Sequence, residues 1–234
     1  MLNIYRKELF NYFWSPIAYI VIPVFLFISG YFFSFSLYYL KVATMSNAFH
    51  NMAILLLLLA PVITMRLLTE EKKSGTLELL FSMPVSIGNL LLGKFLAGIT
   101  LLAIMLLCTF VFLIPLMIHS EPDFGPIWTG YFGIFLIGTA YIAIGLFVSS
   151  LTENQIVAAL GTTAILILLW FIRYIGSFEA LQFINLPFDF ISVSTHQGEF
   201  VRGLINFSSI IYLLSLTGLF YGLTWLRVHL MRYG

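Results

Sequence analysis

The sequence predicts an all-α membrane protein with six transmembrane helices. The chain has 234 residues, of which 61% are hydrophobic and only 9% are charged, whereas soluble domains carry about 25% charged residues. Its apolar residues form six runs that approach or exceed the roughly 20 residues that a helix needs to cross a bilayer. The centres of these runs contain no acidic or basic side chain. A soluble domain of this size cannot bury so much apolar surface, so the composition excludes a soluble protein.

Residues 1–15 predict a helix that lies in the membrane interface. Apolar side chains recur on one face at spacings of three and four, namely Leu2, Tyr5, Leu9 and Tyr12. Polar side chains repeat on another face, namely Asn3, Lys7 and Asn11. This two-sided pattern suits an interfacial helix, and a plain N-terminal tail is the alternative. The apolar run that follows is too long for a cleavable signal peptide, so none is expected.

The six predicted spans follow this helix. They are residues 17–40, 51–68, 87–118, 128–151, 155–172 and 207–227. The third is longer than one span requires, so we expect it to tilt or to project beyond the bilayer. The fourth carries small residues that allow helices to approach closely, namely Gly130, Gly133, Gly138 and Gly145. Their packing partner is either another helix of this chain or a second copy.

Lys and Arg predict the orientation, because they are enriched in cytoplasmic loops. With the N-terminus inside, eight lie on the inner side, namely Arg6, Lys7, Arg66, Lys72, Lys73, Lys94, Arg227 and Arg232. Three lie on the outer side, namely Lys41, Arg173 and Arg202. We therefore expect both termini to face the cytoplasm.

Residues 69–86, TEEKKSGTLELLFSMPVS, form the densest cluster of charge and separate the second span from the third. Ser74 and Gly75 break the run, and residues 76–81 predict a short helix that stops before Pro84. Its apolar side consists of Leu77, Leu80 and Phe81. The segment is either a loop whose apolar side rests on the bilayer or a docking helix for a soluble partner.

Residues 177–206 are too apolar for a solvated loop. Their apolar runs are also too often interrupted to form a transmembrane helix. Backbone at hydrocarbon depth must pair its own polar groups. We therefore expect short helices, broken near Pro187, that lie at the outer interface or dip partly into the membrane. Glu199 and Arg202, three residues apart, are expected to pair at the outer mouth. Such a segment is either a lid that only packs on the spans, or a gate or partner-docking site.

Motifs for catalysis or cofactor binding are weak. Residues 88–94, GNLLLGK, match the start of a phosphate-binding loop, but Phe95 stands where Ser or Thr must hold magnesium. We interpret Lys94 as an interfacial lysine whose stem reaches toward the cytoplasm. The histidines lack metal-ligand spacing, so we expect no metal, cofactor or nucleic acid on this chain.

Three stretches resemble ABC-2-type transporter permeases, the membrane subunits of ATP-driven exporters. The clearest is EEKKSGTLELLFSMPVS at residues 70–86, followed by LLGKF at 91–95. The others are AIGLFVSSLTENQIVA at 143–158 and the N-terminal RKEL and SPIAY motifs. Residues 191–205 resemble the branch that contains the gliding-motility-associated permeases.

The resemblance implies a dimer in the bacterial inner membrane, formed with a second copy or a homologous membrane subunit. Each half would grip one ATP-binding subunit that carries ATP and Mg²⁺, and a periplasmic accessory protein is a further possible partner. The coupling contacts it implies are Gly75, Thr76, Leu77, Glu78, Leu80, Phe81 and Pro84. The alternative is a non-transporting membrane scaffold that passes ATPase-driven motion to an outer partner. A secondary transporter is disfavoured because the span centres lack charge.

Overall fold

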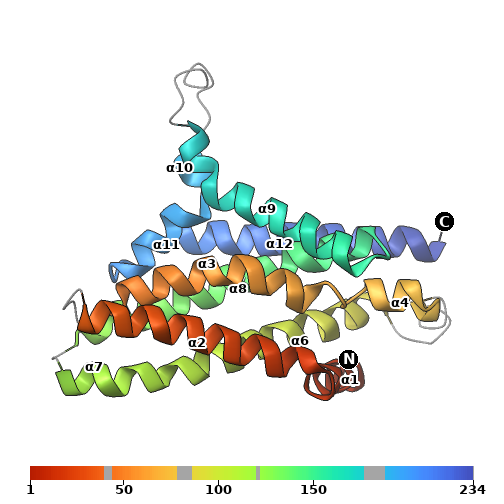
Figure 1. Ribbon diagram of the computed structural model, residues 1–234. Coiled ribbons are helices and arrows are strands. Elements are labelled where there is room, and N and C mark those ends of the chain that lie inside the picture. Colours follow the sequence, from red (N-terminus) through yellow and green to blue (C-terminus); the bar gives the residue numbers. More distant parts are fainter. Residues whose placement is uncertain (40–43, 78–85, 120–121, 177–187, 234) are drawn as a thin grey trace.

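The computed structural model describes residues 1–39, 44–77, 86–119, 122–176 and 188–233, and the regular structure in these ranges is helical. Its elements in chain order are α1 (Leu2–Trp14), α2 (Pro16–Tyr38), α3 (Ser46–Thr64), α4 (Thr69–Lys73), α6 (Ile87–Cys108), the 3₁₀ helix η1 (Thr109–Phe112), α7 (Leu113–His119), α8 (Phe124–Leu151), α9 (Gln155–Gly176), α10 (Phe188–Ile191), α11 (Val193–Val201) and α12 (Phe207–Tyr233). Figure 1 shows both chain termini at one end of the bundle, together with α1 and α4, whereas α11 lies toward the other end.

The prediction of six spans is confirmed. Within the described ranges, six stretches are long and apolar enough to cross a membrane: Pro16–Tyr38, Ser46–Lys73, Ile87–Ile118, Phe124–Leu151, Gln155–Tyr174 and Phe207–Arg232. The second and fourth begin earlier than the hydropathy suggests. In α8 the reason is local, because the Asp123 carboxylate accepts a hydrogen bond from the Gly125 N–H at 3.0 Å and so caps the helix before its apolar run begins.

Helix α8 is the packing centre of the bundle, and its glycines face neighbouring helices of the same chain. A Cβ atom added at Gly145 would lie 2.0 Å from Thr64 Oγ1 of α3, and one at Gly138 would lie 2.5 Å from Leu102 of α6. A Cβ added at Gly130 would similarly overlap Phe49, and one added at Gly133 would overlap Phe200 of α11. The small-residue face of the fourth span therefore packs within this chain.

The long third run is not one straight helix. It consists of α6, the 3₁₀ turn η1 and α7. Pro115 explains the interruption, because its ring crowds the carbonyl of Val111 and it has no N–H to bond there, which favours a tighter turn just before it. Phe112 in η1 stacks on Phe33 of α2 with ring centroids 5.4 Å apart, so the interrupted segment still packs against the bundle.

Helix α1 is a helix as predicted, and it packs on α6 rather than forming a plain tail. Gly93 makes room for it, since a Cβ there would lie 3.0 Å from Ile4 Cγ2. The Tyr12 hydroxyl donates to the Ile63 carbonyl at 2.8 Å, so α1 is also tied to α3. Burial, with a smaller contribution from the Glu8 charge, raises the pKa of Tyr12, so this phenol stays a neutral donor.

Between the fifth and sixth spans, the predicted short helices are present over the described residues 188–201, as α10 and α11, while Pro187 and residues 177–186 lie outside the description. From the sequence we also expect residues 194–198 to be accessible to labelling from outside and Phe183 or Phe190 to be shielded, and this stays a prediction. In the structure His196 and Gln197 are buried, Phe190 is about half exposed, and Phe183 lies outside the described residues. The reason is that α11 packs against α8, α9 and α3 instead of standing at the surface.

The Gly145–Thr64 approach gives a direct test of the packing around α8. Gly145→Ala should lower the free energy of unfolding by about 1–3 kcal/mol, because the added methyl overlaps Thr64 and forces α3 and α8 apart. Gly218→Ala in α12 is the matched control, since a Cβ there meets nothing within 4 Å. Thermal unfolding of the purified protein measures both, and equal stability of the two variants would contradict this packing.

Candidate functional site

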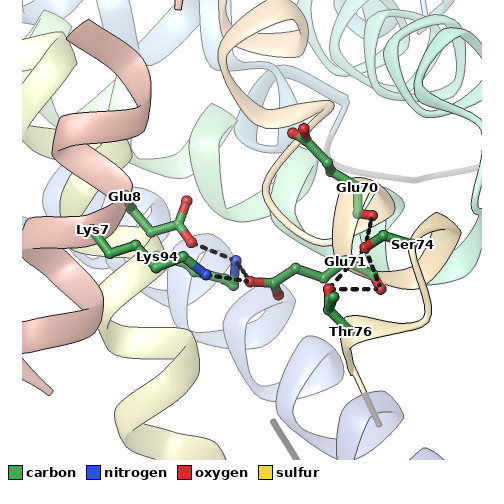
Figure 2. Close-up of polar contacts among 7 residues, drawn as sticks. All are labelled: Lys7, Glu8, Glu70, Glu71, Ser74, Thr76 and Lys94. Atoms are coloured by element: carbon green, nitrogen blue, oxygen red, sulfur yellow. Dashed lines mark hydrogen bonds and ion pairs between the residues drawn. The ribbon is translucent and has the colours of Figure 1, made fainter. Parts of the chain in front are cut away.

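A buried lysine joins three helices at the end of the bundle where both termini lie. The Lys94 side chain of α6 is only 1% exposed, and its Nζ lies 2.8 Å from Glu8 Oε1 of α1 and 2.9 Å from Glu71 Oε1 of α4. Figure 2 shows the ammonium between the two carboxylates. We call this set of residues, Glu8, Glu71 and Lys94, the Lys94 cluster.

The Lys94 cluster corrects the interpretation of Lys94 as a lysine that reaches toward water. Helix α6 begins at Ile87, capped by the Ser86 hydroxyl, so Lys94 lies two turns inside the helix. Its neighbour Gly93 lets the backbone of α1 approach, with Tyr5 N only 3.2 Å from a Cβ built at that glycine. Because α1 covers this part of α6, the ammonium is paired with carboxylates instead of solvent.

The Lys94 cluster contains two carboxylates and one ammonium group. A buried ammonium without partners would carry a large desolvation penalty, and two carboxylates offset it. The Lys7 ammonium, whose side chain is well exposed, lies 3.9 Å from Glu71 Oε1 and adds a second positive charge beside the two negative ones. Glu71 Oε2 is buried without a hydrogen-bond partner among the described residues, so this carboxylate keeps one free acceptor.

Helix α4 is also tied to α8. Lys72 Nζ donates to the carbonyl of Ser150 at 2.8 Å. Ser150 lies in the last turn of α8, where carbonyls lack helical partners and the helix dipole is negative. Through Glu71 and Lys72, the five residues of α4 are therefore held by α1, α6 and α8 together.

The predicted break at Ser74 and Gly75 is present. Gly75 has a φ of +69°, a left-handed conformation that favours glycine. The Ser74 hydroxyl donates to the Glu70 carbonyl at 2.8 Å and closes the turn. Thr76 and Leu77 then resume helical conformation, and Leu77 is buried. The remaining predicted coupling residues, Glu78, Leu80, Phe81 and Pro84, lie outside the described residues.

A polar cleft opens beside the Lys94 cluster, between α1 and the junction of α3 with α4. Its two parts have volumes of about 240 and 170 Å³, and both are lined by Glu8, Asn11, Arg66 and Glu70. Within the described residues, Arg66 Nε is buried without a hydrogen-bond partner. In the same ranges, no group of three His, Cys, Asp or Glu side chains could hold a metal ion.

Glu199 lies in α11 and Arg202 directly follows that helix, and the structure does not pair the two side chains with each other. Among the described ion pairs, none joins these two residues. Helix α11 ends at Val201, and Gly203 turns the chain with a φ of +84°. Arg202 therefore lies beyond the helix and does not share a helix face with Glu199. The Glu199 carboxylate instead accepts hydrogen bonds from Ser209 and Asn206.

Sequence reasoning missed the Lys94 cluster. The available signal was a charged side chain two turns inside an apolar helix, which requires a partner. Glu8 lies 86 residues away along the chain, and periodicity gives no information on contacts at that separation.

Loss of the buried ammonium should be costly. Lys94→Met leaves two buried carboxylates without their cation, so we expect a loss of about 3–5 kcal/mol in the free energy of unfolding. The triple variant Glu8→Gln, Glu71→Gln, Lys94→Met removes the uncompensated charge and should regain much of this loss. Lys73→Met, at an exposed position, is the control and should change stability by about 0.5 kcal/mol or less. Thermal unfolding would contradict the assignment if Lys94→Met matched that control.

Comparison with known proteins identifies the family. The sequence model of the family described as ABC-2 family transporter protein matches residues 33–221, which is most of the chain and includes four of the six spans completely and parts of the first and the sixth. No individually curated protein matches the chain. Because the match covers well over half of the chain, the chain belongs to the ABC-2 transporter family, and it is a multi-pass membrane permease component of an ABC transporter.

Proposed function

We propose that this chain is the permease subunit of an ATP-driven exporter, and that residues 69–86 couple it to a separate ATP-binding subunit. Family membership implies such a partner. The observation that carries the assignment of the segment is the anchoring of α4, which Glu71 and Lys72 tie to α1, α6 and α8. A force applied to the chain beyond Gly75 is therefore transmitted through α4 to α1, α6 and α8.

The proposed mechanism uses the anchored helix as a lever. ATP and Mg²⁺ bind to the partner subunits, and their closure displaces the helix that starts at Thr76. The displacement passes through α4 to Lys94 in α6 and, along the continuous chain, to α3. These are the third and second spans, so work done at the surface becomes relative motion of membrane helices.

The orientation and assembly follow from the same proposal. The end with the Lys94 cluster faces the cytoplasm, where ATP is available, and the Lys and Arg bias supports this side. The complex contains two permease subunits and two ATP-binding subunits in the bacterial inner membrane. The likeness of residues 191–205 to the gliding-motility-associated branch supports placing the chain in the bacterial inner membrane.

A membrane scaffold that moves an outer partner is the competing function, and the ordered helices α10 and α11 between α9 and α12 favour it. Transport and scaffolding differ in whether a cargo crosses the membrane. In sealed vesicles, an exporter shows ATP-dependent accumulation of a substrate that also stimulates the ATPase. A scaffold shows ATPase stimulation by its outer partner without accumulation.

The coupling assignment predicts the effect of a charge reversal. Glu78→Arg should lower the ATPase activity of the complex or the co-purification of the ATP-binding subunit at least several-fold, because it reverses a charge on the proposed docking helix. Glu121→Arg, the same change in the sequence between the third and fourth spans, is the control and should leave both unchanged. Wild-type ATPase activity and complex formation in Glu78→Arg would refute the coupling role.

The orientation predicts a pattern of reporter fusions. Cytoplasmic reporters should be active after Thr69, Asn154 and Arg232, and external reporters after Thr44, Asp123 and Gln197. The reason is that six spans return the chain to its starting side, and the Lys and Arg bias sets that side as the cytoplasm. Measuring both reporter types at all six sites checks the pattern, and one inverted site would contradict it.

A further inference from the structure

A buried histidine links α10, α11 and α12 at the end of the bundle opposite the Lys94 cluster. His196 of α11 is 4% exposed and its ring stacks on Tyr212 of α12 with centroids 4.4 Å apart. Both ring nitrogens have partners. Nδ1 lies 2.8 Å from Ser209 Oγ of α12, and Nε2 lies 2.8 Å from the Phe190 carbonyl oxygen of α10.

The hydrogen-bonded chain continues from Ser209 to a carboxylate. The Ser209 hydroxyl, on a residue that is 1% exposed, also contacts Glu199 Oε2 of α11. The order of groups is therefore the Phe190 carbonyl, the His196 ring, the Ser209 hydroxyl and the Glu199 carboxylate. We call these three side chains, His196, Ser209 and Glu199, the His196 chain.

With neutral His196 and ionised Glu199, the His196 chain has one hydrogen too few to complete its contacts. A carbonyl oxygen only accepts, so the Phe190 contact requires a hydrogen on Nε2. A neutral imidazole then has no hydrogen on Nδ1, and Ser209 has one hydrogen for two neighbours. With neutral His196 and ionised Glu199, one of the two contacts of Ser209 lacks a hydrogen. A single added proton, on Nδ1 or on Glu199, completes every contact.

We propose that the His196 chain is a one-proton binding site that fastens α10 and α11 to α12 when it is protonated and releases them when it is not. The proton comes from solvent and returns there, so no other reactant is needed. With the proton bound the contacts are complete, and without it two acceptors face each other in a buried site.

The surrounding charges allow this assignment. On α10, Asp189 pairs with Arg173 of α9 at 3.1 Å, so its charge is already balanced. On α11 itself, Arg202 lies beyond the helix end. Tyr212 of α12 stacks on the His196 ring, and the nearby Tyr141 of α8 is fully buried.

A second histidine requires a control. His50 of α3 is exposed and contacts Gln197 of α11 through Nδ1 at 3.2 Å. A change in this contact with pH would also alter the packing of α11. A His50→Gln variant separates the two sources, because it leaves the His196 chain intact.

Hydrogen exchange of the full-length protein in lipid nanodiscs tests the proposal. After correction for the intrinsic pH dependence of exchange, amides 193–201 should exchange about tenfold faster at pH 8 than at pH 5, since a buried contact is lost. His50→Gln should keep this step. Glu199→Gln should abolish it and stay protected at both pH values, because its amide donates to Ser209 and frees the Ser209 hydrogen for neutral His196.

Three outcomes would overturn the proposal. They are equal protection of wild-type α11 at pH 5 and 8, an unchanged step in Glu199→Gln, and loss of the step in His50→Gln. Ser209→Ala adds a further check, because it cuts the chain of contacts. It should show the fast exchange of the deprotonated state at both pH values, and a normal pH step in this variant would also count against the site.

Discussion

The buried ammonium of Lys94 is the constraint on which the arrangement of one end of the molecule depends. An ammonium in a 1% exposed position is tolerated only where counter-charges meet it closely. These charges come from α1 and α4, which are separated in sequence by two membrane spans. Their convergence requires α1 to cross α6 at Gly93 and α4 to continue the direction of α3 before the chain turns at Gly75. One buried ammonium therefore holds both α1 and α4 against α6.

The two ends of the bundle are held by different chemistry. The Lys94 cluster pairs full charges in a buried place, and such contacts break only at high cost. The His196 chain uses a hydroxyl as the middle group and depends on a single mobile proton, so its strength varies with conditions. Between them, α8 packs through glycines against α3, α6 and α11 with almost no free space. The close packing along α8 offers a mechanical connection between a permanently fastened end and a conditional one.

Local sequence information predicted the spans because hydropathy acts over one helix at a time. It misplaced helix starts such as that of α8, where the Asp123 cap and not hydropathy decides the first turn. It predicted the turn at Gly75 but not the pairing of Glu71, because that pairing needs α1 and α6 to be placed first. The expected Glu199–Arg202 pair fails for a similar reason. A three-residue spacing guarantees a shared face only while the helix continues, and Gly203 ends it.

The geometry of Glu71 allows α4 to move while the Glu71 carboxylate stays paired with an ammonium group. Its Oε1 lies 2.9 Å from Lys94 and 3.9 Å from Lys7, and its Oε2 is free among the described residues. A small displacement of α4 can therefore exchange one ammonium for the other, so the carboxylate is never left buried without a cation. Lys94 keeps Glu8 throughout, which holds α1 on α6. Under the proposed function, the second ammonium group keeps the Glu71 carboxylate paired while a displacement of α4 is passed to α6, which a single isolated ion pair would not allow.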